Sequence, residues 1–350
     1  MKKKDDYEYF DNINILCFNR PAYASKVFNS INDQIRNIKK TIKINIWIDG
    51  YKNSKEEVNG NIDQTSEVYE IAKNSFDNAN IFQMKENIGI ARIYAKAESY
   101  SLENSTKKYA LFFEDDYILG ESYFAALNIL MEWAFDKEEI AIVTAHGIIS
   151  EYLDSYFNEI TENPSIGPSP IHSLWAYAIK LEHLNEREIF LNEYLSLMEN
   201  TPYHKRNNEL ILEFFNSKGL SFINGTSQDY AKHAALILYN KLAITIPKYL
   251  GEYIGIKGEH SNVQIFKKLG YQQKKGDIFN IEEYKHKLNF YFGFDSLRKI
   301  RKFELLIMHL QSKLEESEKK LKASKNMFYS ALIYSKTKVS KLKNILKSYL

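Results

Sequence analysis

The sequence predicts an α/β protein built on a mostly parallel β-sheet with helices on both faces. Short apolar runs rich in β-branched residues alternate along the chain with longer segments of helical periodicity, and turn-forming residues close most of the runs. Strands joined by helices run parallel through right-handed crossovers, so helices cover both faces of their sheet. Of the 350 residues, 44% are hydrophobic and 26% are charged, which is enough to bury a core and excludes a wholly disordered chain.

The first half of the chain supplies most of the expected strands. The apolar run at 13–18 ends just before Pro21, which suits the first turn of a helix. The run at 42–48 is closed by Asp49-Gly50, a common turn dipeptide. The remaining expected elements are strands at 80–84, 109–113 and 140–144, with helices near 66–76, 90–102 and 122–135.

The pattern is looser in the second half, where proline and glycine gather between 164 and 170. After an apolar stretch at 174–179, helices are expected at 181–198, 207–217 and 227–239, and a strand at 242–246. A long C-terminal helix is expected beyond residue 294, because apolar residues recur there at alternating steps of three and four.

The charge is divided unevenly along the chain. Residues 298–350 contain 14 Lys and Arg against 4 Glu, so the formal net charge of +2 combines a basic tail of +10 with a body of −8. An acidic body does not offer the basic face that nucleic acids require, so no nucleic-acid partner is expected. For the segment 300–350 the pattern fits a coiled-coil homodimer, a basic amphipathic helix on an anionic membrane surface, or a solvated helix.

The composition also bears on the compartment. Cys17 is the only cysteine, so no internal disulfide can form, and no apolar run reaches the ~20 residues that span a bilayer. The polar start of the chain lacks the apolar centre of a signal peptide. We therefore expect a cytoplasmic protein, with peripheral contact at the inner face of the plasma membrane if the tail binds lipid.

Polar residues follow several of the predicted strands. Asn19-Arg20, Asp49 and Glu114–Asp116 each come at the end of a run, and Asn87 opens a predicted helix. The carboxyl ends of parallel strands meet at one edge, where such sheets bind ligands, so these residues are expected to converge. Three adjacent carboxylates repel one another, which favours a hard cation such as Mn²⁺ or Mg²⁺. A solvated acidic turn before the next helix is the alternative.

Four short motifs carry a resemblance to a known family. They are FNRP at 18–21, IDG at 48–50, NIGIARIYA at 87–95 and FEDD at 113–116. In this order they resemble GT-A-fold glycosyltransferases, specifically the family 2 enzymes and the N-acetylglucosaminyltransferase I type, over residues 12–260. The resemblance implies a Rossmann-like GT-A domain at 1–295, with a nucleotide-binding half at about 12–145 and an acceptor half at about 146–295, followed by a helical tail at 296–350.

The resemblance also implies roles for single residues on the donor side. It assigns nucleotide-sugar binding to seven residues: Asn19, Arg20, Asp49, Asn87, Gly89, Arg92 and Asp115. Asp49 would accept from the N–H of uracil, and Arg92 would contact the diphosphate. Taken alone, Arg20 also suits a surface ion pair, and Asp49 also suits a turn.

For the metal and the acceptor, the resemblance implies four more residues. Asp116 would bind Mn²⁺ or Mg²⁺, with His260 as a further ligand. Asp229 would act as the catalytic base, and Trp175 would line the acceptor or sugar pocket. Taken alone, Asp229 also suits a helix cap, Trp175 also suits core packing, and His260 also suits an exposed loop.

Together these implications describe a metal-dependent glycosyltransferase. It would move a sugar from a nucleotide-sugar, with a UDP-sugar favoured, to a glycan or glycoconjugate hydroxyl, with inversion, in surface polysaccharide or glycoconjugate synthesis. A sugar nucleotidyltransferase is a weaker alternative, because residues 19–26 lack the glycines of its phosphate loop. A non-catalytic coiled-coil scaffold with a degenerate nucleotide-sugar fold is the second alternative.

Overall fold

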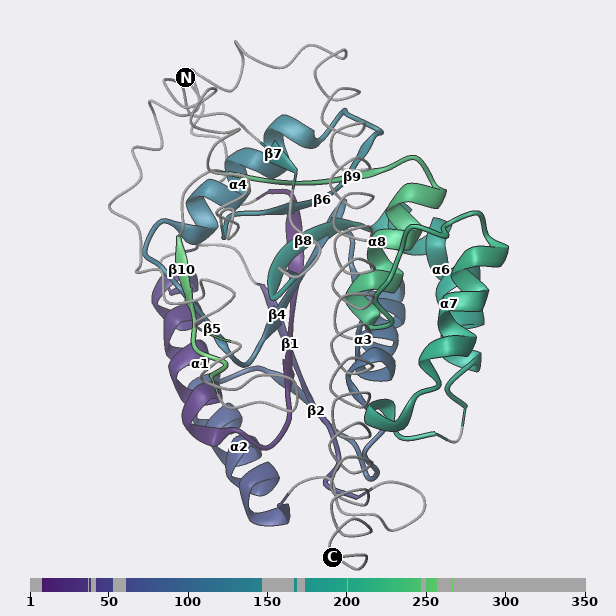
Figure 1. Cartoon of the computed structure of the whole chain (residues 1–350). Coiled ribbons are helices and arrows are strands. Elements are labelled where there is room, and N and C mark those ends of the chain that lie inside the picture. Colours follow the sequence, from purple (N-terminus) through teal and green to yellow (C-terminus); the bar gives the residue numbers. More distant parts are fainter. Residues whose placement is uncertain are drawn as a thin grey trace, which may run out of the picture.

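A mostly parallel eight-stranded sheet organises the protein in its computed structural model (Figure 1). The structure describes residues 8–36, 38, 42–52, 61–146, 167–168, 174–199, 201–246, 250–256 and 266. Along the sheet the strands are β3 (Asn80–Gln83), β2 (Lys43–Ile48), β1 (Phe10–Cys17), β4 (Tyr109–Glu114), β8 (Ala176–Lys180), β6 (Ile140–Thr144), β9 (Leu242–Thr245) and β7 (Gly167–Pro168). The expected α/β class is therefore confirmed.

Strand direction shows where the sheet departs from a purely parallel one. β1 pairs in parallel with both β2 and β4, and β6 pairs in parallel with β9. β8 is inserted between β4 and β6 and runs antiparallel to both. A second, two-stranded sheet pairs β5 (Tyr117–Leu119) with β10 (Gly251–Tyr253) antiparallel, and neither of these strands was expected from the sequence.

Helices cover both faces of the sheet (Figure 1). On one face lie α1 (Pro21–Ile35), α2 (Ile62–Ser75) and α4 (Tyr123–Ala134). On the other lie α3 (Ile90–Asn104), α6 (Leu181–Ser196) and α8 (Gln228–Leu238), with α7 (Asn208–Ser217) packed outside them. These limits lie close to the expected ones in the second half, while α2 begins four residues earlier than expected. None of the helices within the described ranges is both long and apolar enough to cross a membrane.

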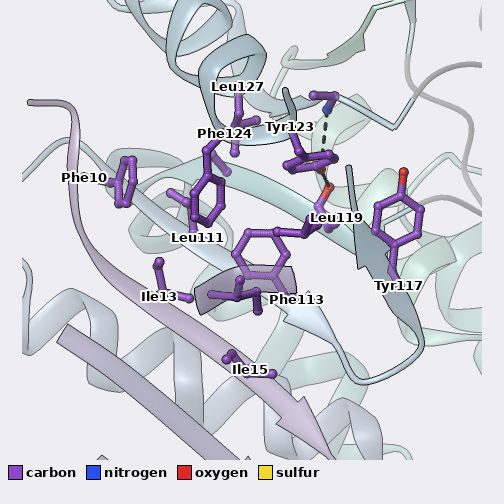
Figure 2. Close-up of a cluster of buried hydrophobic side chains, with 14 of the residues drawn as sticks. Phe10, Ile13, Ile15, Leu111, Phe113, Tyr117, Leu119, Tyr123, Phe124 and Leu127 are labelled. Carbon is purple, nitrogen blue, oxygen red and sulfur yellow. Dashed lines mark hydrogen bonds between the residues drawn. The ribbon is translucent and has the colours of Figure 1, made fainter. Parts of the chain in front are cut away.

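Successive side chains of each strand point to opposite faces of the sheet, so the hydrophobic core has one part on each face. On β1, Ile13 and Ile15 pack toward α1 and α4, together with Phe113 of β4 and Phe124 of α4 (Figure 2). Leu16 points to the opposite face and packs with residues of α3 and β2. Each strand therefore buries both of its sides, as expected for a sheet covered by helices.

Buried asparagines form a hydrogen-bonded network on the α3 face of β1, β2 and β3. Asn45 Nδ2 donates to Asn12 Oδ1 at 2.6 Å, and Asn80 Nδ2 donates to Asn45 Oδ1 at 2.9 Å. Asn14 donates to Ser101 Oγ of α3 at 2.9 Å and accepts from the Trp47 indole at 3.0 Å. Since Asn12, Asn14 and Asn45 are fully buried, these bonds offset the cost of removing their amides from water.

Several predictions concern residues outside the described ranges. The long C-terminal helix, the domain boundary at 295/296 and the loop that holds His260 belong to this part of the chain. The dimer and membrane interpretations of 300–350 therefore remain predictions.

Candidate functional site

Two of the predicted polar clusters flank the end of β1 directly. The amide of Asp49 donates to the carbonyl of Cys17 at 3.1 Å, and the amide of Asp115 donates to the carbonyl of Leu16 at 3.1 Å. These bonds continue the β2–β1 and β1–β4 ladders beyond the strands. From β1 the chain proceeds to β2 and β3 on one side and then returns to β4 on the other, so the edge between β1 and β4 is a topological switch point.

Arg20 bridges the two aspartates at this switch point. Its Nη1 donates to Asp116 Oδ2 at 2.7 Å, and its Nη2 makes a short ion pair with Asp115 Oδ1. Burial alone would lower the pKa of Arg20, but the charges of Asp115 and then Asp116 raise it above its ordinary value. Burial raises the pKa of Asp115, although Arg20 and the amide of Phe18, which donates to Asp115 Oδ2 at 3.2 Å, oppose this shift. The two carboxylates therefore require a cation beside them.

The donor set at Asp116 fits a divalent cation that also binds phosphate. Asp116 Oδ1 is buried and has no hydrogen-bond partner in the described part of the chain. Within the same residues, no group of three or more His, Cys, Asp or Glu side chains is arranged around a common point. Mg²⁺ and similar ions are held in this way by one or two carboxylates together with substrate phosphates and water.

Comparisons with known proteins provide three similar solved structures. One is the mannosyltransferase PcManGT of Pyrobaculum calidifontis in complex with GDP-Man and Mn²⁺, at 14% identity and a TM-score of 0.37 over 52% of this chain and 48% of that one. The others are S. aureus TarS 1–349 (12%, TM-score 0.37, 65% and 70% covered) and the galactosyltransferase LgtC with donor and acceptor sugar analogues (12%, TM-score 0.36, 66% and 72% covered). The chain spans about half the length of the mannosyltransferase. No protein-family model and no curated protein sequence matches it.

Asp49 holds the turn that leads into α3. Its Oδ1 accepts from the amides of Gly50 and Ile88, and its Oδ2 accepts from the amide of Gly89, each at 2.9 Å. Gly89 has a φ of +79°, and a Cβ there would lie 2.8 Å from Tyr203 Cβ, so the turn requires glycine. Asn87 Nδ2 donates to the carbonyl of Gly50 at 2.8 Å and closes the same turn. The structure therefore brings Asp49, Asn87 and Gly89 together.

Two other predicted donor-side residues differ in their surroundings. Arg92 donates from Nη2 to the carbonyl of Met198 at 2.9 Å, so this nitrogen joins α3 to the end of α6. Asn19 lies between Phe18 and Arg20 and is partly exposed at the same edge. It directly precedes Arg20, which bridges Asp115 and Asp116 (the acidic pair).

Asp229 lies at the start of α8, beside a buried cluster of three charged residues that was not predicted from the sequence. These residues are Glu98, Arg187 and Lys232. Asp229 Oδ1 accepts from the side-chain amide of Gln228 at 2.6 Å. Burial raises the pKa of Asp229 to about 6, and nearby Lys232 partly opposes this shift. Burial lowers the pKa of Lys232 to about 8. Near pH 7, Asp229 is therefore mostly ionised but much more basic than an ordinary aspartate.

Glu114 connects this cluster to the acidic pair. It is the last residue of β4, and its side chain points to the face opposite to that of Phe113, where Tyr94 Oη donates to its Oε1 at 2.8 Å. Burial raises the pKa of Glu114 well above its ordinary value, and the charges of Asp116 and then Asp229 add to the shift. The alternation of strand residues could have predicted the direction of this side chain, but not its partners.

Trp175 belongs to an aromatic layer next to the acidic pair. Its ring stacks on Tyr253 with 4.1 Å between centroids and an interplanar angle of 14°, and it also contacts Tyr117 and His146. A Cβ on Gly255 would lie 2.3 Å from the Tyr253 hydroxyl and 2.7 Å from Asp116 Oδ2, so the layer and the acidic pair share one wall. His146 was not predicted. It is fully buried, its Nε2 has no hydrogen-bond partner within the described residues, and burial lowers its pKa to about 3.

Proposed function

We propose that this chain is a metal-dependent glycosyltransferase that uses a nucleotide-sugar donor. The observation that carries the proposal is the acidic pair at the β1–β4 switch point, where Arg20 bridges Asp115 and Asp116 and one buried Asp116 oxygen lacks a partner among the described residues. Carboxylates at such an edge suit a divalent ion that carries a diphosphate. The resemblance in the FNRP, IDG, NIGIARIYA and FEDD motifs supports the same function.

On the donor side, Asp116 would hold Mn²⁺ or Mg²⁺, with Asp115 beside it. When bound, the ion would neutralise the charge that develops on the leaving diphosphate. Once the carboxylates have a second cation, the planar fork of Arg20 can turn toward a phosphate oxygen. Asp49 would keep the turn at 87–89 in place, and the preference for UDP rests on the resemblance.

On the acceptor side, Asp229 is the proposed general base. Its pKa of about 6 leaves it ionised near neutral pH while keeping it basic enough to take a proton from a hydroxyl in hydrogen-bond reach. A base that acts on the acceptor, opposite the leaving group, predicts inversion at the sugar carbon. Trp175, buried and stacked on Tyr253 beside the acidic pair, would line the wall of the acceptor or sugar pocket.

The proposal includes a biological setting. The resemblance implies a glycan or glycoconjugate acceptor, and the sequence predicts a cytoplasmic location and dimer or membrane contact through 300–350. Deleting 300–350 should leave nucleotide binding intact and reduce dimer mass or liposome association. If both the mass and the lipid partitioning are unchanged, the proposed role of the tail is wrong.

The decisive experiment is donor hydrolysis, screened over UDP-, GDP- and dTDP-sugars with and without Mn²⁺. We expect one donor class to be hydrolysed in a Mn²⁺-dependent way, and Asp116→Asn to abolish this dependence. Asp63→Asn, at an exposed aspartate in the first turn of α2, is the matched control and should behave like the wild type. The proposal fails if folded wild-type protein neither hydrolyses these donors nor binds UDP with Mn²⁺ in calorimetry.

A further inference from the structure

A cavity lies on the α3 face of the sheet. It has a volume of about 160 Å³ and runs between α3 and α6, with the first turn of α8 at one end. Tyr94, Glu98, Gln228 and Lys232 line it and are each at least nine-tenths buried. Gln228 lines the cavity and directly precedes Asp229, so one end of the cavity lies next to the proposed base.

Gln228 presents an unused acceptor in this cavity. Its Oε1 is buried and has no hydrogen-bond partner within the described residues, while its Nε2 donates to Asp229. A buried amide oxygen without a partner is costly, so a ligand that donates a hydrogen bond would be favoured there. Because Nε2 donates to Asp229, the oxygen is the amide atom that remains for a ligand.

Lys232 presents the complementary donor. Its ammonium donates to Tyr177 Oη at 3.0 Å and lies 3.0 Å from the centre of the Tyr94 ring. An ammonium has three protons, so it can also donate to a ligand oxygen. The nearby Glu98 is neutralised by Arg187 at 2.7 Å, so its carboxylate adds acceptor capacity without an unpaired charge.

Part of the cavity wall is apolar. Leu184, Leu191 and Leu195 of α6 face α3 across it. A cavity of about 150 Å³ accepts a benzene ring, so about 160 Å³ accommodates the ring of one sugar unit, while the opening at the exposed Ser99 leaves room for its substituents. A pyranose combines this size with hydroxyls that both donate and accept and with C–H groups that pack on leucine.

From this combination we infer that the α3–α6 cavity binds one pyranose unit of the acceptor glycan. Only the assignment of this pyranose to an acceptor substrate rests on the proposed function. Lys232 and Glu98 would bind hydroxyls, and Gln228 would accept from one hydroxyl while donating to Asp229. Gln228 thereby couples occupancy of the cavity to the position of the base and is a positioning residue.

The test uses the full chain and four methyl pyranosides, those of glucose, galactose, mannose and N-acetylglucosamine, in saturation-transfer difference NMR. At least one should give a signal with the wild type. Ser99→Trp introduces an indole at the exposed rim of the cavity and should abolish this signal. Lys96→Trp, at an exposed position of the same helix outside the cavity, should leave it unchanged. Gln228→Met keeps the bulk but removes the acceptor and should weaken binding about five- to tenfold.

Three results would overturn the inference. They are the lack of a signal from every pyranoside, an undiminished signal in folded Ser99→Trp, and binding of cyclohexanol at least as strong as that of the best pyranoside. The last result would describe a purely apolar cavity. Donor hydrolysis and calorimetry of UDP with Mn²⁺ on the same wild-type sample separate the two proposals, because pyranoside binding with neither donor hydrolysis nor UDP binding would refute the proposed function while leaving the pyranose site in place.

Discussion

Tyr94 of α3 and Glu114 of β4 are joined by a hydrogen bond of 2.8 Å between the phenol oxygen and the carboxylate Oε1. This bond links the helix behind the edge to the residue that precedes Asp115. It also links the proposed donor edge to the cavity, since the Tyr94 ring lies beneath the ammonium of Lys232.

Removing this hydrogen bond should cost stability. Tyr94→Phe leaves the partly buried Glu114 without this donor, so the free energy of unfolding should fall by about 2 kcal/mol. Burial raises the pKa of Glu114 and the bond from Tyr94 opposes this shift, so removing the bond raises that pKa further and the loss should grow with pH, being larger at pH 8 than at pH 5. Urea denaturation at both values measures it. Tyr100→Phe, whose hydroxyl accepts only a longer 3.3 Å bond from Asn80, should change stability less, and equal losses would contradict the explanation.

Asp229 should leave a pH signature in both stability and rate. Its folded-state pKa of about 6 lies above the ordinary 3.8, so its contribution to stability is lost as the pH rises from about 4 to about 6. Relative to the wild type, Asp229→Asn should therefore gain about 2 kcal/mol between pH 4 and pH 7 in denaturant titrations. If Asp229 is the base, kcat/KM should also fall below about pH 6 as the carboxylate becomes protonated. A pH-independent stability difference between the two proteins would contradict the shifted pKa.

The ion pair between Glu98 and Arg187 should be costly to break from one side. Arg187 is fully buried, and its Nε and Nη1 have no hydrogen-bond partner within the described residues, so Glu98→Gln should destabilise by about 3–5 kcal/mol. Replacing both residues by leucine should cost much less than the two single changes together. A double-mutant cycle in denaturant measures the coupling. The exposed pair Arg36–Asp33 is the control, with an expected coupling below about 1 kcal/mol.

The asparagine network should be sensitive to single truncations. Asn14→Ala removes a buried amide that bonds Ser101 and Trp47, and it should lower the free energy of unfolding by about 3 kcal/mol. Asn61→Ala removes the cap that accepts from the amide of Asp63 at 2.8 Å at the exposed start of α2, and it should cost about 1 kcal/mol. Thermal or urea unfolding gives both values. If the two costs are similar, the buried network is not a major source of stability.

Local patterns were sufficient to predict much of the fold and the convergence at its edge. Apolar runs followed by turn formers located β1, β2 and β4, and parallel topology then placed Arg20, Asp49 and Asp115 together. The direction of β8 was not predicted, because a short apolar run does not indicate whether the strand runs parallel or antiparallel to its neighbours. The strands β5 and β10 were missed for a related reason, since each has only three residues and is defined by its partner.

The side-chain partners depend on tertiary contacts and were therefore beyond the sequence. Glu98, Lys232 and Tyr94 come from two helices whose packing brings them together, and no spacing in the sequence signals this. For the asparagines a signal did exist. Asn12 and Asn14 alternate with isoleucines in one apolar strand, and Asn45 does so in the next, which is unusual for strands buried on both sides.

The asparagine network also determines how far each strand advances toward the edge. A shift of β2 by two residues would keep every isoleucine on its own side, so hydrophobic alternation alone distinguishes this competing alignment poorly. The amide contacts penalise such a shift toward the end of β1, because Asn45, now in register with Asn14, would lie opposite Leu16 and lose its hydrogen bond to Asn12. The buried asparagines thus help to set the register of β2 against β1. Without them, the same layers could assemble with a shifted register that misplaces Asp49 relative to Asp115 and Asp116.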